Sequence, residues 1–248
     1  MLNPEITRFL NDLDLPGGLR HGRCPKDGYA RGWGLQFGEL GELIRAEPLF
    51  QKALSAAELS LVQEDRLMNL YLLATRYLTK LAVRNIVEFG SYKGGSAIFL
   101  ATVMKYIDPQ AHVLALDTFA GMPATDKTID AHSTGDFSDT TLADFQARIA
   151  ALGLDNLTPV QGRFEDTFPA CANNLRFGIA HIDCDIYSAV KFVQDAVWPL
   201  MGDGGYVVYD DATVTSCLGA TEAVEDLIMT KRIHSEQIFP HFVFRAFH

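Results

Sequence analysis

The sequence predicts a doubly wound α/β fold, in which a mostly parallel sheet is covered by helices on both faces. From residue 84 onward, short apolar runs alternate with helix-like runs, and the first pair is joined by the glycine-rich turn of "IVEFGSYKGGSAIFLATVM". The chain has 248 residues, of which 48% are hydrophobic and 21% charged, so it can bury a large core. This length fits one α/β domain with an appendage.

Seven short apolar runs are expected as strands, at residues 85–89, 112–117, 157–161, 177–183, 205–210, 235–239 and 242–247. The helices expected between them span residues 96–106, 142–152, 188–200 and 220–231. Residues 81–248 would therefore form the sheet domain, preceded by a helical extension at residues 1–80. In such a sheet, ligands bind at the carboxyl ends of the strands.

Two polar segments are too long to be ordinary turns. The first is the glycine-rich, basic arm "PGGLRHGRCPKDGYARGWGLQFG" of the N-terminal extension. The second, at residues 121–141, follows the second strand and is expected as a lid over the ligand edge, with a solvated loop as the alternative. We expect its His132 to be a solvated loop residue rather than a second base or a substrate contact.

The composition argues against several classes of protein. A net charge of -10 disfavours a nucleic-acid-binding protein, which needs a basic face to replace counterions. Neither a signal peptide nor a membrane-spanning run is recognisable, so we expect a cytoplasmic protein that does not act at a membrane. The four cysteines lack a CxxC pair, which argues against a zinc site or a disulfide framework and favours reduced thiols; they are Cys24, Cys171, Cys184 and Cys217.

The turn "EFGSYKGGS" favours S-adenosylmethionine over a dinucleotide. Tyr92 stands where a GxGxxG fingerprint has the glycine that lets the backbone approach a pyrophosphate. Glu88 at the strand end would repel phosphate but could accept hydrogen bonds from an ammonium group. The cofactor carboxylate would lie on the backbone N–H groups that open the next helix. The residues assigned to the cofactor here are Glu88, Gly90, Ser91, Tyr92, Gly94 and Ser96.

The next two strand ends carry weaker signals for the same cofactor. Asp117 in "VLALDTF" could accept both ribose hydroxyls, although a strand-end aspartate is about as often a helix cap. In "VQGRFEDTFP", Phe164 could lie against the adenine ring, with a core position as the alternative, and Glu165 or Asp166 could reach the exocyclic amine. The further residues assigned to the cofactor are Asp117, Thr118, Phe119, Gly162, Phe164 and Asp183.

Four aspartates follow the fourth and fifth expected strands: Asp183 and Asp185 in "HIDCDIYSAV", and Asp210 and Asp211 in "GGYVVYDDAT". Neighbouring carboxylates repel one another unless a cation or protons neutralise them. Oxygen-only ligands favour Mg²⁺, with Mn²⁺ and Ca²⁺ as alternatives, over Zn²⁺. We expect three ligands and one free carboxylate, which could take a proton from a metal-bound hydroxyl group before methyl transfer to oxygen. The structural alternative is that one aspartate caps the following helix.

Six motifs taken in order, "VEFGSYKGGSA", "LDTFAGMP", "GRFEDTFP", "HIDCDIYSAV", "GGYVVYDDAT" and "SCLGATEAV", resemble those of the macrocin O-methyltransferase family. The resemblance covers about residues 84–226. It implies a class I, Rossmann-like methyltransferase fold whose sheet has seven strands, the last one antiparallel to the others. It also implies that Asp183, Asp210 and Asp211 bind magnesium, that Asp185 is the general base and that S-adenosylmethionine is the cofactor.

The sequence therefore predicts a magnesium-dependent O-methyltransferase acting on a hydroxyl group of a small molecule, with a sugar of a secondary metabolite or glycan as the first acceptor. A catechol-type methyltransferase is the enzyme alternative, although its third ligand is usually asparagine where Asp211 stands. A catalytically inactive binding subunit and, more remotely, a nicotinamide dehydrogenase are the others. Helical pieces in the N-terminal extension without an obvious place on the sheet favour a homo-oligomer.

Overall fold

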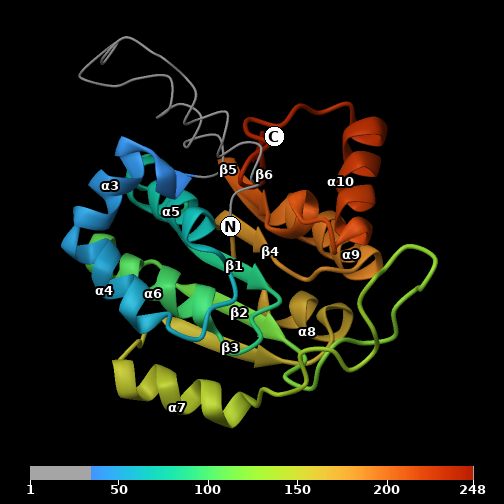
Figure 1. The fold of residues 1–248 in the computed structure, drawn as a ribbon, viewed down its shortest axis with the longest axis horizontal. Helices are drawn as coiled ribbons and strands as arrows, with labels where there is room; N and C mark the ends of the chain where they lie inside the picture. The colour runs from blue at the N-terminus through green and yellow to red at the C-terminus, as the bar shows by residue number, and fades with distance from the viewer. Residues whose placement is uncertain (1–34, 248) are drawn as a thin grey trace, which may run out of the picture.

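The computed structural model describes residues 35–247, so most of the glycine-rich arm lies outside the described residues. A six-stranded sheet in the order β3-β2-β1-β4-β5-β6 forms its centre (Figure 1). The strands are β1 (Ile86–Phe89), β2 (Val113–Asp117), β3 (Leu157–Gln161), β4 (Phe177–Ile182), β5 (Met201–Tyr209) and β6 (Phe242–Ala246). Neighbouring strands are parallel except β5 and β6. The predicted α/β fold with an antiparallel last strand is confirmed.

Helices cover both faces of the sheet. One face carries α3 (Glu39–Ala46), α4 (Pro48–Ala56), α5 (Glu64–Leu72), α6 (Gly95–Ile107) and α7 (Leu142–Leu152); the other carries α8 (Phe164–Cys171), α9 (Tyr187–Val197) and α10 (Leu218–Lys231). Short helical turns are η1 (Leu35–Phe37), η2 (Leu73–Tyr77), η3 (Leu78–Lys80), η4 (Trp198–Leu200) and η5 (Asp211–Thr213). Within the described residues, no helix is both long and apolar enough to cross a membrane.

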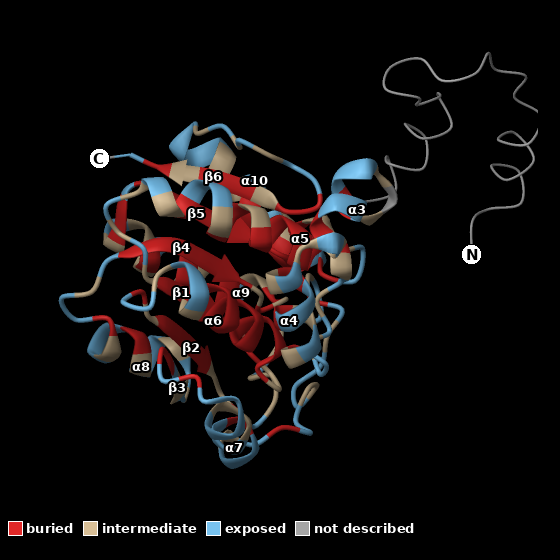
Figure 2. Ribbon diagram, turned by 90° about the vertical axis from the view of Figure 1, so that its left-hand side faces the viewer, coloured by how far each residue is buried: buried red, intermediate tan, exposed pale blue. Residues whose placement is uncertain are grey.

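Alternation along the strands supplies the two hydrophobic cores. Val113 and Ala115 of β2 join the first helical layer, whereas Leu114 and Leu116 join the second, because successive strand side chains point to opposite faces. Figure 2 shows the central strands buried between helices that expose their outer faces. Both faces of the sheet are thus apolar, as a parallel sheet between two helical layers requires.

The described part of the N-terminal extension packs directly onto the sheet domain. Phe50 of α4, Tyr71 of α5 and Phe99 of α6 are buried and meet edge to face. Their ring centroids lie 5.3, 5.7 and 6.5 Å apart. Truncating one such buried aromatic ring costs about 3–5 kcal/mol, so this contact fixes α5 over the sheet. It thereby fixes the position of Arg66, which lies in α5.

A seventh strand is not found among residues 35–247. The run expected at residues 235–239 contributes only an isolated bridge between Gln237 and Val243. Ile238 and Phe239 are exposed, and Pro240 has no N–H group for a strand ladder. Conversely, α8 was not expected, because it has only eight residues and contains Pro169.

The loop of residues 118–141 joins β2 to α7 and extends past the sheet beside α9 (Figure 1). Asp130, only 5% exposed, fastens it, since its Oδ1 accepts a hydrogen bond from the backbone N–H of Tyr187 at 2.9 Å. Gly219 of α10 leaves room for this carboxylate: a Cβ atom there would lie 2.0 Å from Asp130 Oδ1. The loop is therefore held at the junction of α9 and α10.

Candidate active site

A cavity of about 320 Å³ lies at the carboxyl edge of the sheet. The ends of all five parallel strands contribute to its wall, together with residues 59–63 between α4 and α5 and with His132 of the 118–141 loop. Binding sites of doubly wound sheets lie at this edge because the helices begin there and strand-end side chains converge. The cavity is therefore the place to look for the predicted site residues.

The glycine turn after β1 owes its sequence to close packing. Gly90 has φ +89°, and a Cβ atom there would lie 1.7 Å from the carbonyl oxygen of Asp183. Gly94, with φ +77°, precedes α6 and offers no side chain to cap it. A helix start without a side-chain cap leaves backbone N–H groups for an anion. Ser91 Oγ is buried beside these groups and has no hydrogen-bond partner among the described residues.

Asp117 holds the turn in place. Its Oδ2 accepts hydrogen bonds from the backbone N–H groups of Ser91 and Tyr92 at 2.9 and 2.7 Å. Its Oδ1 accepts one from the N–H of Phe119 at 2.7 Å. The carboxylate still faces the cavity. It therefore couples the ends of β1 and β2, and each oxygen keeps a lone pair for a hydroxyl donor.

The predicted cofactor residues divide into two groups. Eight line the cavity: Gly90, Ser91, Tyr92, Ser96, Asp117, Thr118, Phe164 and Asp183. Four do not line it: Glu88, Gly94, Phe119 and Gly162. Glu88 is fully buried, and His181 Nδ1 lies 3.0 Å from its Oε2. The structure thus places Glu88 beneath the cavity floor, with its other oxygen lacking a hydrogen-bond partner among the described residues.

The predicted metal ligands converge. Carboxylate oxygens of Asp183, Asp210 and Asp211 lie within 4.8 Å of one another. Burial and the charges of Asp210 and Asp211 raise the pKa of Asp183 well above its usual range. Burial, Asp185 and Asp210 likewise raise the pKa of Asp211. A buried set of mutually repelling oxygen donors fits a hard divalent cation, which would relieve the repulsion.

Asp210 differs from its two neighbours because cationic groups hold it. His241 Nε2 lies 2.7 Å from its Oδ1, His181 Nε2 lies 3.5 Å from the same oxygen, and Arg66 forms an ion pair with its Oδ2 at 2.9 Å. Burial alone would raise the pKa of Asp210, but these three groups lower it well below the usual range. Asn69 Nδ2, 3.0 Å from His241 Nδ1, orients the second imidazole. Sequence analysis did not connect Arg66 or His241 with the site, since neither adjoins a strand end.

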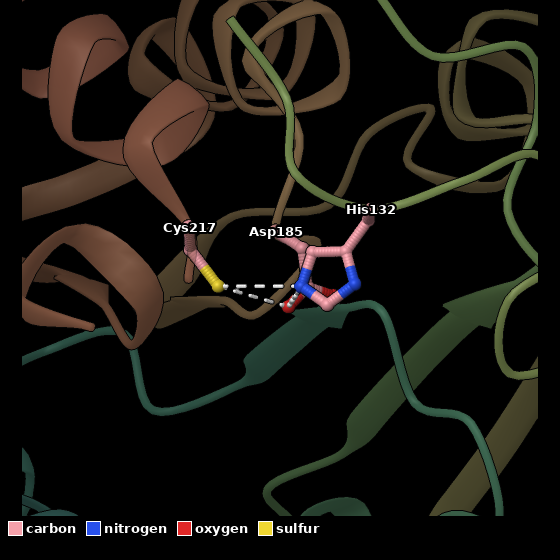
Figure 3. A group of neighbouring side chains, drawn as sticks. All are labelled: His132, Asp185 and Cys217. Atoms are coloured by element: carbon pink, nitrogen blue, oxygen red, sulfur yellow. Dashed lines mark hydrogen bonds and ion pairs between the residues drawn. The ribbon is translucent and has the colours of Figure 1, made fainter. Parts of the chain in front are cut away.

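Asp185 lies directly after β4, with a left-handed backbone (φ +58°) that is uncommon for a residue other than glycine. Its N–H donates to Asp211 Oδ2 at 2.8 Å. Its Oδ1 accepts a hydrogen bond from Cys217 Sγ at 3.3 Å and lies 3.5 Å from His132 Nε2 (Figure 3). Burial raises the pKa of Asp185. The structure thus places this carboxylate beside the predicted metal ligands but not among them.

His132 is part of the cavity wall, contrary to the expectation of a solvated loop residue. Its side chain is 20% exposed, and its ring lies between Asp136 and Asp185, 3.5 Å from a carboxylate oxygen of each. No local pattern in "GMPATDKTIDAHSTGDFSDTT" marks this position. Only the fold of the loop, fastened by Asp130, brings the ring to the site.

Comparison with known proteins gives a consistent picture. The family described as macrocin-O-methyltransferase (TylF) matches residues 52–238. The 8-demethyl-8-(2,3-dimethoxy-alpha-L-rhamnosyl)-tetracenomycin-C 4'-O-methyltransferase of Streptomyces olivaceus is 28% identical over 171 residues, 65% of this chain and 65% of that protein. The mycinamicin III 3''-O-methyltransferase of Micromonospora griseorubida is 27% identical over 154 residues, 57% of this chain and 60% of that protein. The chain thus spans less than two thirds of either relative.

Solved structures share the fold. The O-methyltransferase NovP superposes with a TM-score of 0.64 at 20% identity, over 74% of this chain and 80% of that one. The calicheamicin methyltransferase CalS11 superposes with a TM-score of 0.64 at 16% identity, over 99% of this chain and 94% of that one. The predicted class I methyltransferase architecture is confirmed, with six strands in the described residues.

Proposed function

Because the chain belongs to the macrocin-O-methyltransferase (TylF) family, we propose that it methylates a sugar hydroxyl group of a small molecule with S-adenosylmethionine as donor. The observation that carries the proposal is the cavity itself, where an uncapped helix start and Asp117 face a three-aspartate cluster. The sugar is proposed because one relative's name specifies 4'-O-methylation of a compound with a rhamnosyl group.

S-adenosylmethionine would lie along the turn after β1. Its carboxylate would meet the N–H groups at the start of α6 and the unpartnered Ser91 hydroxyl. Asp117 would accept the ribose hydroxyls, and Phe164 would contact the adenine ring, since both line the cavity. The cofactor supplies an electrophilic methyl group on a sulfonium. Glu88, below the floor, would support the turn through β1 rather than touch the cofactor.

A divalent cation, Mg²⁺ first and Mn²⁺ or Ca²⁺ as alternatives, would be held by Asp183, Asp210 and Asp211. The fit rests on the oxygen-only donors, their mutual repulsion and their burial. When bound, the cation lowers the pKa of a coordinated hydroxyl group. Arg66, His181 and His241 fix the orientation of Asp210, as the outer partners of metal ligands commonly do.

Asp185 would serve as the general base. Its carboxylate lies next to the cluster, and burial raises its pKa toward the range in which a carboxylate accepts a proton readily. The hydrogen bond from its N–H to Asp211 fixes the backbone, while Cys217 and His132 orient Oδ1. The acceptor proton would pass to Asp185 as the hydroxyl oxygen attacks the methyl group.

Calorimetric titration tests the proposal. S-adenosylmethionine, its demethylated product and NAD are titrated into the purified protein, each with magnesium and after chelation. Binding of the first two but not of NAD, followed by methylation of deoxysugar-bearing acceptors but not of catechol, supports the proposal. Absence of binding of either sulfur compound overturns it, and methylation restricted to catechol overturns its choice of acceptor.

A further inference from the structure

Three different ligand atoms meet at the wall of the cavity, beside the aspartate cluster. Asp185 Oδ1 lies 3.3 Å from Cys217 Sγ and 3.5 Å from His132 Nε2. Cys217 Sγ lies 3.6 Å from His132 Nε2. The three residues come from the loop after β2, the loop after β4 and the residue before α10, and Figure 3 shows them pointing toward one another.

These spacings correspond to one face of a zinc tetrahedron. Zinc binds sulfur at about 2.3 Å and nitrogen or oxygen at about 2.0–2.1 Å. Tetrahedral angles then place the ligand atoms roughly 3.3–3.6 Å from one another. All three observed distances fall in this interval, so an ion could bind without rearrangement of the chain.

We propose that His132 Nε2, Asp185 Oδ1 and Cys217 Sγ form a site for a transition-metal ion, Zn²⁺ first, separate from the three-aspartate cluster. Imidazole and thiolate ligands select zinc over magnesium, whereas the aspartate cluster offers only oxygen atoms. As the ion binds, the thiol proton passes to solvent and sulfur coordinates as thiolate. Thiolate and carboxylate together balance the charge of a divalent ion. A water molecule from the cavity would complete the tetrahedron.

The surroundings of His132 support this assignment. Metal-binding imidazoles commonly donate their second ring N–H to a carboxylate, which fixes the tautomer. Asp136 Oδ2 lies 3.5 Å from His132 Nδ1, on the ring edge opposite the ligand atoms. Nε2 is thereby left free to coordinate. The sequence argued against a zinc site because no CxxC pair is present, but this site uses one cysteine and draws its ligands from distant segments.

The consequence for activity rests on the proposed function, in which Asp185 is the base. An ion held at this site would occupy the oxygen that accepts the acceptor's proton, and it would tie the 118–141 loop to α10. The site would therefore be inhibitory: zinc would stop methyl transfer even when magnesium saturates the aspartate cluster.

The test uses Co²⁺ as a spectroscopic probe on the full-length, reduced protein in a large excess of magnesium. One equivalent is expected to give the thiolate-to-cobalt charge-transfer band and the visible bands of a tetrahedral ion, both abolished by stoichiometric Zn²⁺. Cys217→Ser and His132→Gln should abolish the thiolate band, and Asp136→Asn should weaken cobalt binding about tenfold. Absence of the band in the wild type, or its persistence in Cys217→Ser, overturns the proposal.

Matched controls separate this site from other groups. Cys171→Ser, Cys24→Ser and the exposed His234→Gln should keep the full band, as should Asp183→Asn, which alters only the aspartate cluster. Circular dichroism verifies folding, and His132→Gln, on the surface loop, decides if Cys217→Ser misfolds. This readout needs no methyl transfer, so it stands if the proposed function fails. Where an acceptor is known, Cys217→Ser should raise the inhibiting zinc concentration at least tenfold, and equal zinc sensitivity in both proteins counts against the inhibitory role.

Discussion

Asp211 Oδ2 accepts a hydrogen bond from the backbone N–H of Asp185 at 2.8 Å. This contact joins the end of β5 to the chain after β4 and stabilises the left-handed backbone of Asp185. A predicted metal ligand therefore also fixes the proposed base. The two roles, inferred separately from neighbouring strand ends, are linked through one carboxylate.

Asp185→Asn is expected to lower turnover by about 10²–10⁴-fold, because an amide cannot accept the proton in the reaction. Binding of S-adenosylmethionine should not change, since the cofactor would lie on the β1 turn. Single-turnover assays and calorimetry measure the two quantities, with Asp203→Asn, an exposed aspartate, as control. Turnover near the wild-type rate would place the base elsewhere.

Magnesium is expected to stabilise the fold through the aspartate cluster. At a concentration 100-fold above its Kd, a ligand that binds only the folded state adds about 2.7 kcal/mol to the free energy of unfolding. Asp183→Asn should remove this increment and should also stabilise the chelated protein, because it removes a buried carboxylate that repels its neighbours. Urea unfolding in magnesium and in chelator measures both effects. An unchanged magnesium increment in the variant would contradict the metal assignment.

Gly90→Ala should destabilise the fold much more than Gly135→Ala. Both glycines have nearly the same left-handed φ, +89° and +87°, so alanine pays a similar backbone cost of about 1–2 kcal/mol at each. A Cβ atom at position 135 meets nothing within 4 Å, whereas at position 90 it overlaps the Asp183 carbonyl oxygen. We expect an additional loss of about 2 kcal/mol or more for Gly90→Ala. Equal losses in denaturant unfolding would show that the contact between β1 and β4 relaxes without cost.

His181 should make the chelated protein less stable at high pH. Burial alone would lower the pKa of this imidazole, but Asp210 and Glu88 raise it to about 9, above the ordinary 6.5. Protonated His181 therefore favours the folded state: its contribution is fully present below pH 6.5 and is lost as pH rises through 9. The loss in free energy of unfolding amounts to at most about 3 kcal/mol.

The difference between wild type and His181→Gln, measured by urea unfolding from pH 6 to 10, isolates this contribution. The exposed His234→Gln serves as control. A difference that stays constant over this range would show that His181 is neutral in the fold.

Sequence patterns were sufficient for the parts of the site that depend on strand ends. Asp117, Asp183 and Asp210 each follow an apolar run, and parallel strands bring such residues to one edge. Patterns failed where position depends on long-range packing. Glu88 lies at a strand end, but its side chain points to the face shared with His181, and four residues do not reveal which face is the cavity side. His132 and Arg66 reach the site only through the fold of a loop and the packing of α5.

The fastening of the 118–141 loop has a consequence for the evolution and engineering of this enzyme. Because Asp130 occupies the space that a side chain at position 219 would fill, the two positions cannot change independently. A larger residue at 219 would become acceptable only after Asp130 had been replaced, and a loop transplanted from a relative would need its own partner in α10. Diversification of the loop that surrounds the acceptor is thus constrained by a single glycine on a different helix.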